Sequence, residues 1–312
     1  QNHSWPLKDL LKKAEAKSCE GLSIEELSKG RGLAHVVSNM IEFKKRPASD
    51  SQRDEQIQLE ELEKVMSAKG KLAKQFKNYE YREPQRKMLS LITSSFNDKE
   101  PVIIEAGTGT GKSLAYILPS VWWALQNNTP VVISTRTKNL QSQLIDKDLP
   151  IITKVLGQQV NALVLKGREN YVCLRRLELL FKKVLLGGSL DQVINLMPLL
   201  IWLSKSETGD LSELHPLLHR FFFQSIRSEA TACLGSKCAL HGCCFLENIR
   251  KHARRADVLI VNHALLCADL SGEGYLLPEY NQVVIDEGHA LEDAATESFA
   301  ITLSVSTISE EL

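Results

Sequence analysis

Short continuous apolar runs alternate with helical stretches from about residue 79 onward. The runs that we expect to form strands are residues 102–105, 131–134, 162–165, 258–261 and 283–286. Continuous runs of this kind, rich in β-branched residues, are typical of strands that are buried on both faces. The pattern therefore predicts an α/β fold in which helices connect the strands of a parallel sheet.

Two regions interrupt this rhythm. Before residue 79, apolar positions recur at helical spacing, in short helices at 6–43 and again at Leu59, Leu62 and Met66. After Lys166, two Leu-rich helical stretches replace the strands. We therefore expect a helical N-terminal region and linker at 1–78, a sheet domain in two parts, and an insertion between the parts. The sheet domain occupies 79–165 and 246–312, and the insertion between these two parts occupies 166–245. A further insertion is expected to begin within 246–312.

Charge is balanced, with 38 Lys and Arg against 38 Asp and Glu. No overall positive field draws the chain to nucleic acid, so any such contact has to use local patches. No apolar run approaches the roughly 18 residues of a membrane span. We expect no membrane partner, and a location in the cytoplasm and nucleoid of a bacterium or in the nucleus of a eukaryote.

A glycine-rich segment joins the first expected strand to a helical stretch that begins at Leu114. The segment reads Ala106, Gly107, Thr108, Gly109, Thr110, Gly111, Lys112 and Ser113. Glycines let successive backbone N–H groups turn inward around phosphates at a helix N-terminus. The pattern predicts an ATP site in which Lys112 binds the β and γ phosphates and the Ser113 hydroxyl is a ligand of Mg²⁺. Ala106 replaces the first glycine of the strict pattern, and a small residue suffices there.

Two adjacent carboxylates follow the last expected strand. Asp286 can hold Mg²⁺, often through water, and Glu287 can polarise the attacking water. An Asp-Glu pair is weak evidence by itself, but together with the lysine loop it favours a nucleotide hydrolase. His289 is expected to couple the nucleotide site to the rest of the protein, although an ordinary surface histidine fits the pattern too.

Four of the seven cysteines lie between Cys233 and Cys244, and Cys173 lies alone about sixty residues earlier. Four thiolates hold either tetrahedral zinc or a [4Fe-4S] cluster, and spacing alone does not separate the two. Zinc ligands usually come as two close pairs, a pattern that these spacings fit poorly. Cys19 and Cys267 are expected to be small buried residues.

Four segments together resemble the iron-sulfur superfamily 2 DNA helicases of the DinG/XPD type. They are the run Arg82, Glu83, Pro84, Gln85; the phosphate loop preceded by Glu105; residues 166–173 with the later cysteines; and the run Asp286, Glu287, Gly288, His289. The family usually has Ala in place of Gly288. The resemblance implies a RecA-like sheet domain, ATP and Mg²⁺, a [4Fe-4S] cluster, and unwinding of DNA in the 5′ to 3′ direction during repair or replication.

The resemblance also implies roles for particular residues. Gln85, with Arg82, would recognise the adenine side of ATP. The ligands of the cluster would be Cys173, Cys233, Cys238 and Cys244. Cys244 is preferred to Cys243 because the family has a five-residue gap after the third ligand and an aromatic or apolar residue after the last, here Phe245. His241 lies in the same region and is the less favoured alternative.

DNA, single-stranded or forked, is the expected partner; protein partners are not predicted. By the resemblance, the segments 134–137 and 139–143 touch the DNA backbone, although an ordinary Ser/Thr-rich turn would read the same way. Basic residues flank the cysteines and suit a passing DNA strand. They are Arg168, Arg175, Arg176, Lys182, Lys183, Arg250, Lys251, Arg254 and Arg255.

A helicase of this type has a second sheet domain that supplies an arginine to the γ phosphate. Too few residues follow Glu287 for such a domain. We therefore expect the chain to be the N-terminal half of an ATP-dependent DNA helicase, with little turnover alone. The alternative is a non-catalytic DNA-binding or regulatory module that nucleotide binding switches.

Overall fold

The fold comes from a computed structural model, which describes residues 53–76, 79–107, 109–187, 190–272 and 276–300. The short helices and the linker expected before residue 53 lie outside these ranges, as do Cys19 and Thr108. Within the described residues, no helix is long and apolar enough to cross a membrane.

The chain forms two compact units. Among the described residues, one unit lies within 53–166 and 252–300, and the other lies within 167–251. The four strands of the described residues belong to the first unit, which we call the sheet unit. The second is built from helices and contains the cysteine-rich segment, and we call it the helical unit.

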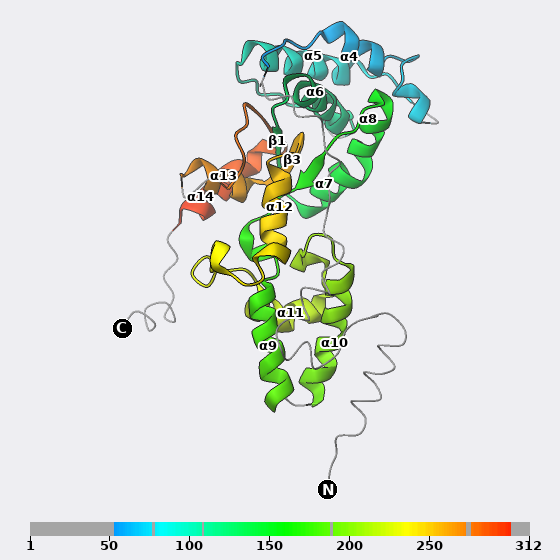
Figure 1. The fold of residues 1–312 in the computed structure, drawn as a ribbon. Helices are drawn as coiled ribbons and strands as arrows, with labels where there is room; N and C mark the ends of the chain where they lie inside the picture. The colour runs from blue at the N-terminus through cyan, green and yellow to red at the C-terminus, as the bar shows by residue number, and fades with distance from the viewer. Residues whose placement is uncertain (1–52, 77–78, 108, 188–189, 273–275, 301–312) are drawn as a thin grey trace. The chain divides into compact units, whose positions relative to one another are not determined.

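The sheet unit contains a parallel sheet, as the apolar runs predicted. Its strands are β1 (Val131–Thr135), β2 (Ala162–Val164), β3 (Val258–Asn262) and β4 (Gln282–Ile285). Their order is β2-β3-β1-β4, and every pair is parallel. Because β1 pairs with β3 on one side and β4 on the other, segments far apart in the sequence end at one edge of the sheet (Figure 1).

The prediction of a first strand at residues 102–105 was wrong. Residues 102–105 form no strand, and the Ile103 side chain is fully exposed. An extended segment becomes a strand only when a neighbour takes up its backbone hydrogen bonds. In the described sheet β4 is an outer strand that pairs with β1 alone, and residues 102–105 form no ladder with its unpaired side.

Helices surround the strands of the sheet unit. They are α4 (Leu59–Met66), α5 (Glu83–Asp98), α6 (Lys112–Asn127), α7 (Lys138–Gln143), a π-helical turn (Leu144–Asp148), α8 (Leu149–Leu156), α13 (His263–Leu270) and α14 (Leu291–Phe299). Side chains cap two of them: Thr137 accepts from the Leu140 N–H at 3.2 Å, and Asn262 accepts from the Leu265 N–H at 3.0 Å. Such caps satisfy the free N–H groups of the first turn.

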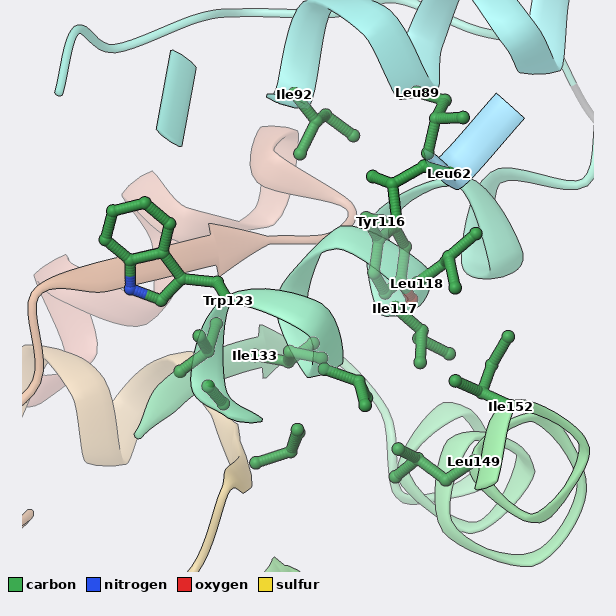
Figure 2. Packing of buried hydrophobic residues seen from close by; sticks show 14 of the residues in the cluster. Leu62, Leu89, Ile92, Tyr116, Ile117, Leu118, Trp123, Ile133, Leu149 and Ile152 are labelled. Atoms are coloured by element: carbon green, nitrogen blue, oxygen red, sulfur yellow. The ribbon is translucent and has the colours of Figure 1, made fainter. Parts of the chain in front are cut away.

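One apolar core joins α4, α5, α6 and α8 to the strands. Figure 2 shows its members, among them Leu62 from α4, Leu89 from α5, Ile133 from β1 and Ile152 from α8. Helix α6 supplies the largest share, and ten of its residues are buried. This packing fixes the helix that begins at the phosphate loop.

The helical unit has its own core. Its helices are α9 (Leu174–Gly187), α10 (Leu190–Lys205), α11 (Pro216–Ile226) and α12 (Phe245–Ala253), whose last residues pass into the sheet unit. Helices α9, α10 and α11 pack against one another (Figure 1). Phe245 is fully buried in this core, and its ring occupies the space that a side chain at Gly209 would need.

Candidate functional site

The predicted phosphate loop leads directly into α6. Gly109 and Gly111 have φ of +78° and +80°, a left-handed backbone that favours glycine. The Thr110 hydroxyl donates to the Gly107 carbonyl at 2.9 Å and closes the turn. The loop therefore lies at the N-terminus of a 16-residue helix, where free N–H groups and the helix dipole favour an anion.

Arg82 and Gln85 hold this loop. Gln85 is 5% exposed, and its Nε2 donates to the Gly111 carbonyl at 2.9 Å. The Arg82 guanidinium donates to the Gly109 carbonyl and pairs with Glu80 at 3.0 Å. A Cβ atom at Gly111 would displace the Gln85 amide, and the positive φ of Gly111 independently favours glycine. Both side chains therefore hold the phosphate loop through hydrogen bonds to its carbonyl groups.

The two carboxylates approach the loop from the end of β4. Lys112 Nζ lies 3.9 Å from Glu287 Oε1, and the Tyr116 hydroxyl donates to Asp286 Oδ2 at 3.0 Å. The Asp286 N–H donates to the Ser134 carbonyl on β1 at 2.9 Å, so the sheet fixes the start of this turn. Glu287 has φ of +56°, a strained conformation for a residue with a side chain.

His289 follows in the same turn. Its Nδ1 lies 3.6 Å from Glu287 Oε2, and its side chain is 66% exposed. The contact places the ring beside the second carboxylate, at the surface.

Sequence analysis did not select Tyr116 or Asp148, which both lie near Ser113. Burial and the neighbouring Asp286 carboxylate raise the pKa of Tyr116 far above its ordinary value, so its hydroxyl keeps its proton. Burial also raises the pKa of Asp148, and the Gln143 amide and the Ser113 hydroxyl oppose that shift. Tyr116 lies one helical turn after Lys112, and this spacing was the one feature of the sequence that could have indicated a place near the phosphate loop.

His263 was missed as well. It begins α13 after β3, it is 3% exposed, and its Nδ1 lies 2.7 Å from the Ser134 hydroxyl. Burial lowers the pKa of His263 and favours the neutral ring.

The expected DNA-contact segment divides into a buried part and an exposed part. Ser134 and Thr135 have no exposed surface, so in this conformation their hydroxyls cannot reach DNA. Arg136, Lys138 and Asn139 are exposed at the start of α7. Only this second part presents donors to solvent.

The four cysteines that the resemblance selected line one cavity of the helical unit. Cys173 precedes α9, whereas Cys233, Cys238 and Cys244 come from the loop before α12. The loop consists of consecutive tight turns, in which the Cys238 N–H donates to the Gly235 carbonyl at 3.1 Å. His241 lines the same cavity.

Cys243 differs from its neighbour Cys244. Its thiol donates to the Leu240 carbonyl at 3.4 Å and packs against the apolar core of the helical unit. It is absent from the residues that line the cavity. Cys267 is 5% exposed in the sheet unit, as expected of a small buried residue.

The donors of the cavity are of the type that a [4Fe-4S] cluster requires. Such a cluster takes four thiolates, each bound to a different iron, and four cysteines from two separate segments of the chain line this cavity. Within the described ranges, no group of three His, Cys, Asp or Glu side chains is arranged around a single metal ion.

Several of the predicted basic residues are engaged within the helical unit. Arg176 pairs with Glu229 at 2.5 Å and donates to the Gln224 carbonyl at 2.7 Å. Arg175 donates to the Ala232 carbonyl at 2.5 Å. These two arginines therefore hold the cysteine-bearing segment, whereas Lys183 and Lys251 are exposed.

Comparison with known proteins finds helicases whose sequences are similar to this chain. The model of the DEAD/DEAH box helicase family matches residues 82–196. The chain is 40% identical over 242 residues to the ATP-dependent DNA helicase YoaA of Escherichia coli, a match that covers 75% of this chain and 37% of YoaA. It is 36% identical over 247 residues to the ATP-dependent helicase DinG of Mycobacterium tuberculosis, covering 73% and 37%.

A third relative carries a different name. The chain is 34% identical over 220 residues to the 3′-5′ exonuclease DinG of Bacillus subtilis, a match that covers 70% of this chain and 23% of that protein. The matches to these three relatives thus span less than two fifths of the length of each.

Proposed function

We infer that this chain, which belongs to the DinG-type ATP-dependent DNA helicases and carries a DEAD/DEAH box helicase domain, is the ATP-binding motor half of such an enzyme. One observation carries the inference: the lysine of a phosphate loop lies 3.9 Å from a carboxylate that follows a neighbouring strand. A cation for the phosphates and a carboxylate for the attacking water thus lie close together.

Each residue of this site has a proposed role. Lys112 binds the β and γ phosphates, and the backbone N–H groups of the loop bind the same phosphates from the helix end. Ser113 and Asp286 hold Mg²⁺, which neutralises charge on the phosphates when it is bound. Glu287 polarises the attacking water, and His289 relays changes at Glu287 to the surface.

The helical unit is proposed to be the iron-sulfur insertion of the motor. Cys173, Cys233, Cys238 and Cys244 would hold a [4Fe-4S] cluster, which when bound joins two segments of the chain by covalent bonds. The common cavity and the separation of Cys243 from it support this ligand set.

The proposed substrate of the whole protein is single-stranded or forked DNA, unwound 5′ to 3′ in repair or replication. Exposed donors at Arg136, Lys138 and Asn139 support contact with the phosphate backbone. A second motor domain, outside this chain, would supply the arginine that completes the ATP site. A nucleotide-switched module without turnover is the alternative. Phosphate release by the whole protein with single-stranded DNA separates the two functions, because this chain alone is expected to turn over little ATP in either case.

Replacing Lys112 with Ala tests the nucleotide site. At ATP concentrations 100 times Kd, binding adds about 2.7 kcal/mol to the stability of the folded state. For a unit of this size that corresponds to a rise in Tm of roughly 5–10 °C. Lys112→Ala should abolish the rise, whereas Lys154→Ala, which removes an exposed lysine of α8, should keep it. Equal ATP-dependent stabilisation of both variants would contradict the proposed site.

A further inference from the structure

We propose that Tyr116 is a positioning residue for Mg²⁺, and that its hydroxyl fixes the Asp286 carboxylate in the orientation that binds the ion. This inference rests on the proposed function, because it assigns Asp286 to the metal. It adds a residue that lies outside the phosphate loop and outside the carboxylate turn.

Each of the two carboxylate oxygens of Asp286 accepts a hydrogen bond. Oδ2 accepts from the Tyr116 hydroxyl at 3.0 Å, and Oδ1 accepts from the Glu287 N–H at 3.1 Å. Two donors on different elements fix the plane of the carboxylate. Each oxygen of an ionised carboxylate accepts more than one bond, so each keeps a free position toward a metal or its water.

Tyr116 is well suited to hold another group in place. It is 2% exposed and belongs to the core that Figure 2 shows, with Leu62 and Leu89. Packing on this scale locks the ring, so the hydroxyl has little freedom to follow a moving carboxylate. The packing that fixes the Tyr116 ring therefore also restricts the orientation of the Asp286 carboxylate, to which its hydroxyl is bonded.

The second proposed ligand of Mg²⁺ lies beside the same hydroxyl. Ser113 is one helical turn before Tyr116 on α6, and its hydroxyl neighbours the phenol. One phenol thus lies next to both protein groups assigned to the ion. Residues that orient metal ligands typically change metal affinity or activity 10–100-fold when they are replaced.

The alternative is that the bond only satisfies a buried hydroxyl. Every buried phenol needs an acceptor, and Asp286 is within reach. In that case removal of the hydroxyl would alter stability and affect nucleotide binding equally with and without metal. A positioning role instead affects the metal-bound nucleotide alone.

The test compares Tyr116→Phe with a matched control in the same unit. Tyr79→Phe also removes one phenol hydroxyl, which donates to the Met66 carbonyl at 2.6 Å. The measured quantities are the Kd of ATP with Mg²⁺ and the Kd of ATP in EDTA. Tyr116→Phe should weaken binding of Mg·ATP at least about 10-fold and leave binding of metal-free ATP unchanged. Tyr79→Phe should change neither Kd.

A second variant keeps the test decisive if the Phe variant does not fold. p-Aminophenylalanine at position 116 keeps the ring and a donor and should restore the Mg·ATP affinity of the wild type. Unchanged Mg·ATP affinity in Tyr116→Phe, or a loss in the amino variant as large as in the Phe variant, would overturn the inference. If wild type gains no Lys112-dependent stabilisation from ATP, the proposed function itself fails, which is a different result.

Discussion

The two adjacent cysteines give opposite predictions under the same chemical change. Cys244→Ser should remove the iron-sulfur cluster, because Cys244 lines the cavity with the other three proposed ligands. Cys243→Ser should retain the cluster, because the Cys243 thiol packs against the core and donates to the Leu240 carbonyl. Each variant is therefore the matched control of the other.

The size of the effect on stability follows from the loop that the cluster closes. About sixty residues separate Cys173 from Cys233. By the chain-entropy argument used for disulfides, a covalent link across such a loop contributes about 4 kcal/mol. Cys243→Ser keeps a donor for the Leu240 carbonyl, so it should cost about 1 kcal/mol or less. The two variants should therefore differ by roughly 3 kcal/mol in the free energy of unfolding of the helical unit.

The assay is iron and sulfide content after anaerobic purification, followed by thermal unfolding. Wild type and Cys243→Ser should contain about four iron and four sulfide per chain, the content of one cluster. Cys244→Ser should contain almost none and should unfold at a lower temperature. Bound zinc without iron would refute the proposed cofactor, and cluster loss in Cys243→Ser with retention in Cys244→Ser would reverse the choice of ligand.

Two further predictions concern the phosphate loop and the helical unit. Gly111→Ala should cost about 2–3 kcal/mol in stability, from left-handed backbone strain and the lost hydrogen bond to Gln85, and it should weaken ATP binding; denaturant titration and calorimetry measure both. Burial opposes the charge of Glu229, but hydrogen bonds from Arg176 and Arg227 outweigh burial and hold the pKa of Glu229 below its ordinary value. Its stabilising contribution should be complete above the unfolded-state pKa of about 4.3 and lost as pH falls through the folded-state pKa. Glu229→Gln should therefore lower Tm at pH 7, and this difference from wild type should shrink as the pH falls through the folded-state pKa. A difference in Tm that does not change with pH would contradict the ion pair.

Local sequence predicted the strands that a parallel sheet buries. The apolar runs at 131–134, 162–165, 258–261 and 283–286 became β1, β2, β3 and β4, with ends shifted by a residue or less. β-Branched residues at these positions have one stable environment, which is burial on both faces. The run at 102–105 has the same composition but forms no strand. Its outcome depends on a neighbour elsewhere in the chain, which composition does not encode.

The sequence also did not predict the direction in which particular polar side chains point. The resemblance placed Ser134 and Thr135 in a segment that touches the DNA backbone, yet both are buried at the carboxyl end of β1. Arg175 and Arg176 read as part of a basic patch, yet carbonyls and a carboxylate bind them within the helical unit. Residue type identifies which groups can donate a hydrogen bond, whereas only the fold decides which acceptor they meet.

The residues that sequence analysis missed connect the motifs that it found. Tyr116 reaches Asp286 across 170 positions of the chain, and Ser134 reaches His263 across 129. No local pattern predicts such pairs, but the topology does, because parallel strands bring their carboxyl ends to one edge. Ser134 on β1 accepts the Asp286 N–H through its carbonyl and meets His263 through its hydroxyl. Hydrogen bonds therefore join the carboxyl ends of β1, β3 and β4 beside the phosphate loop.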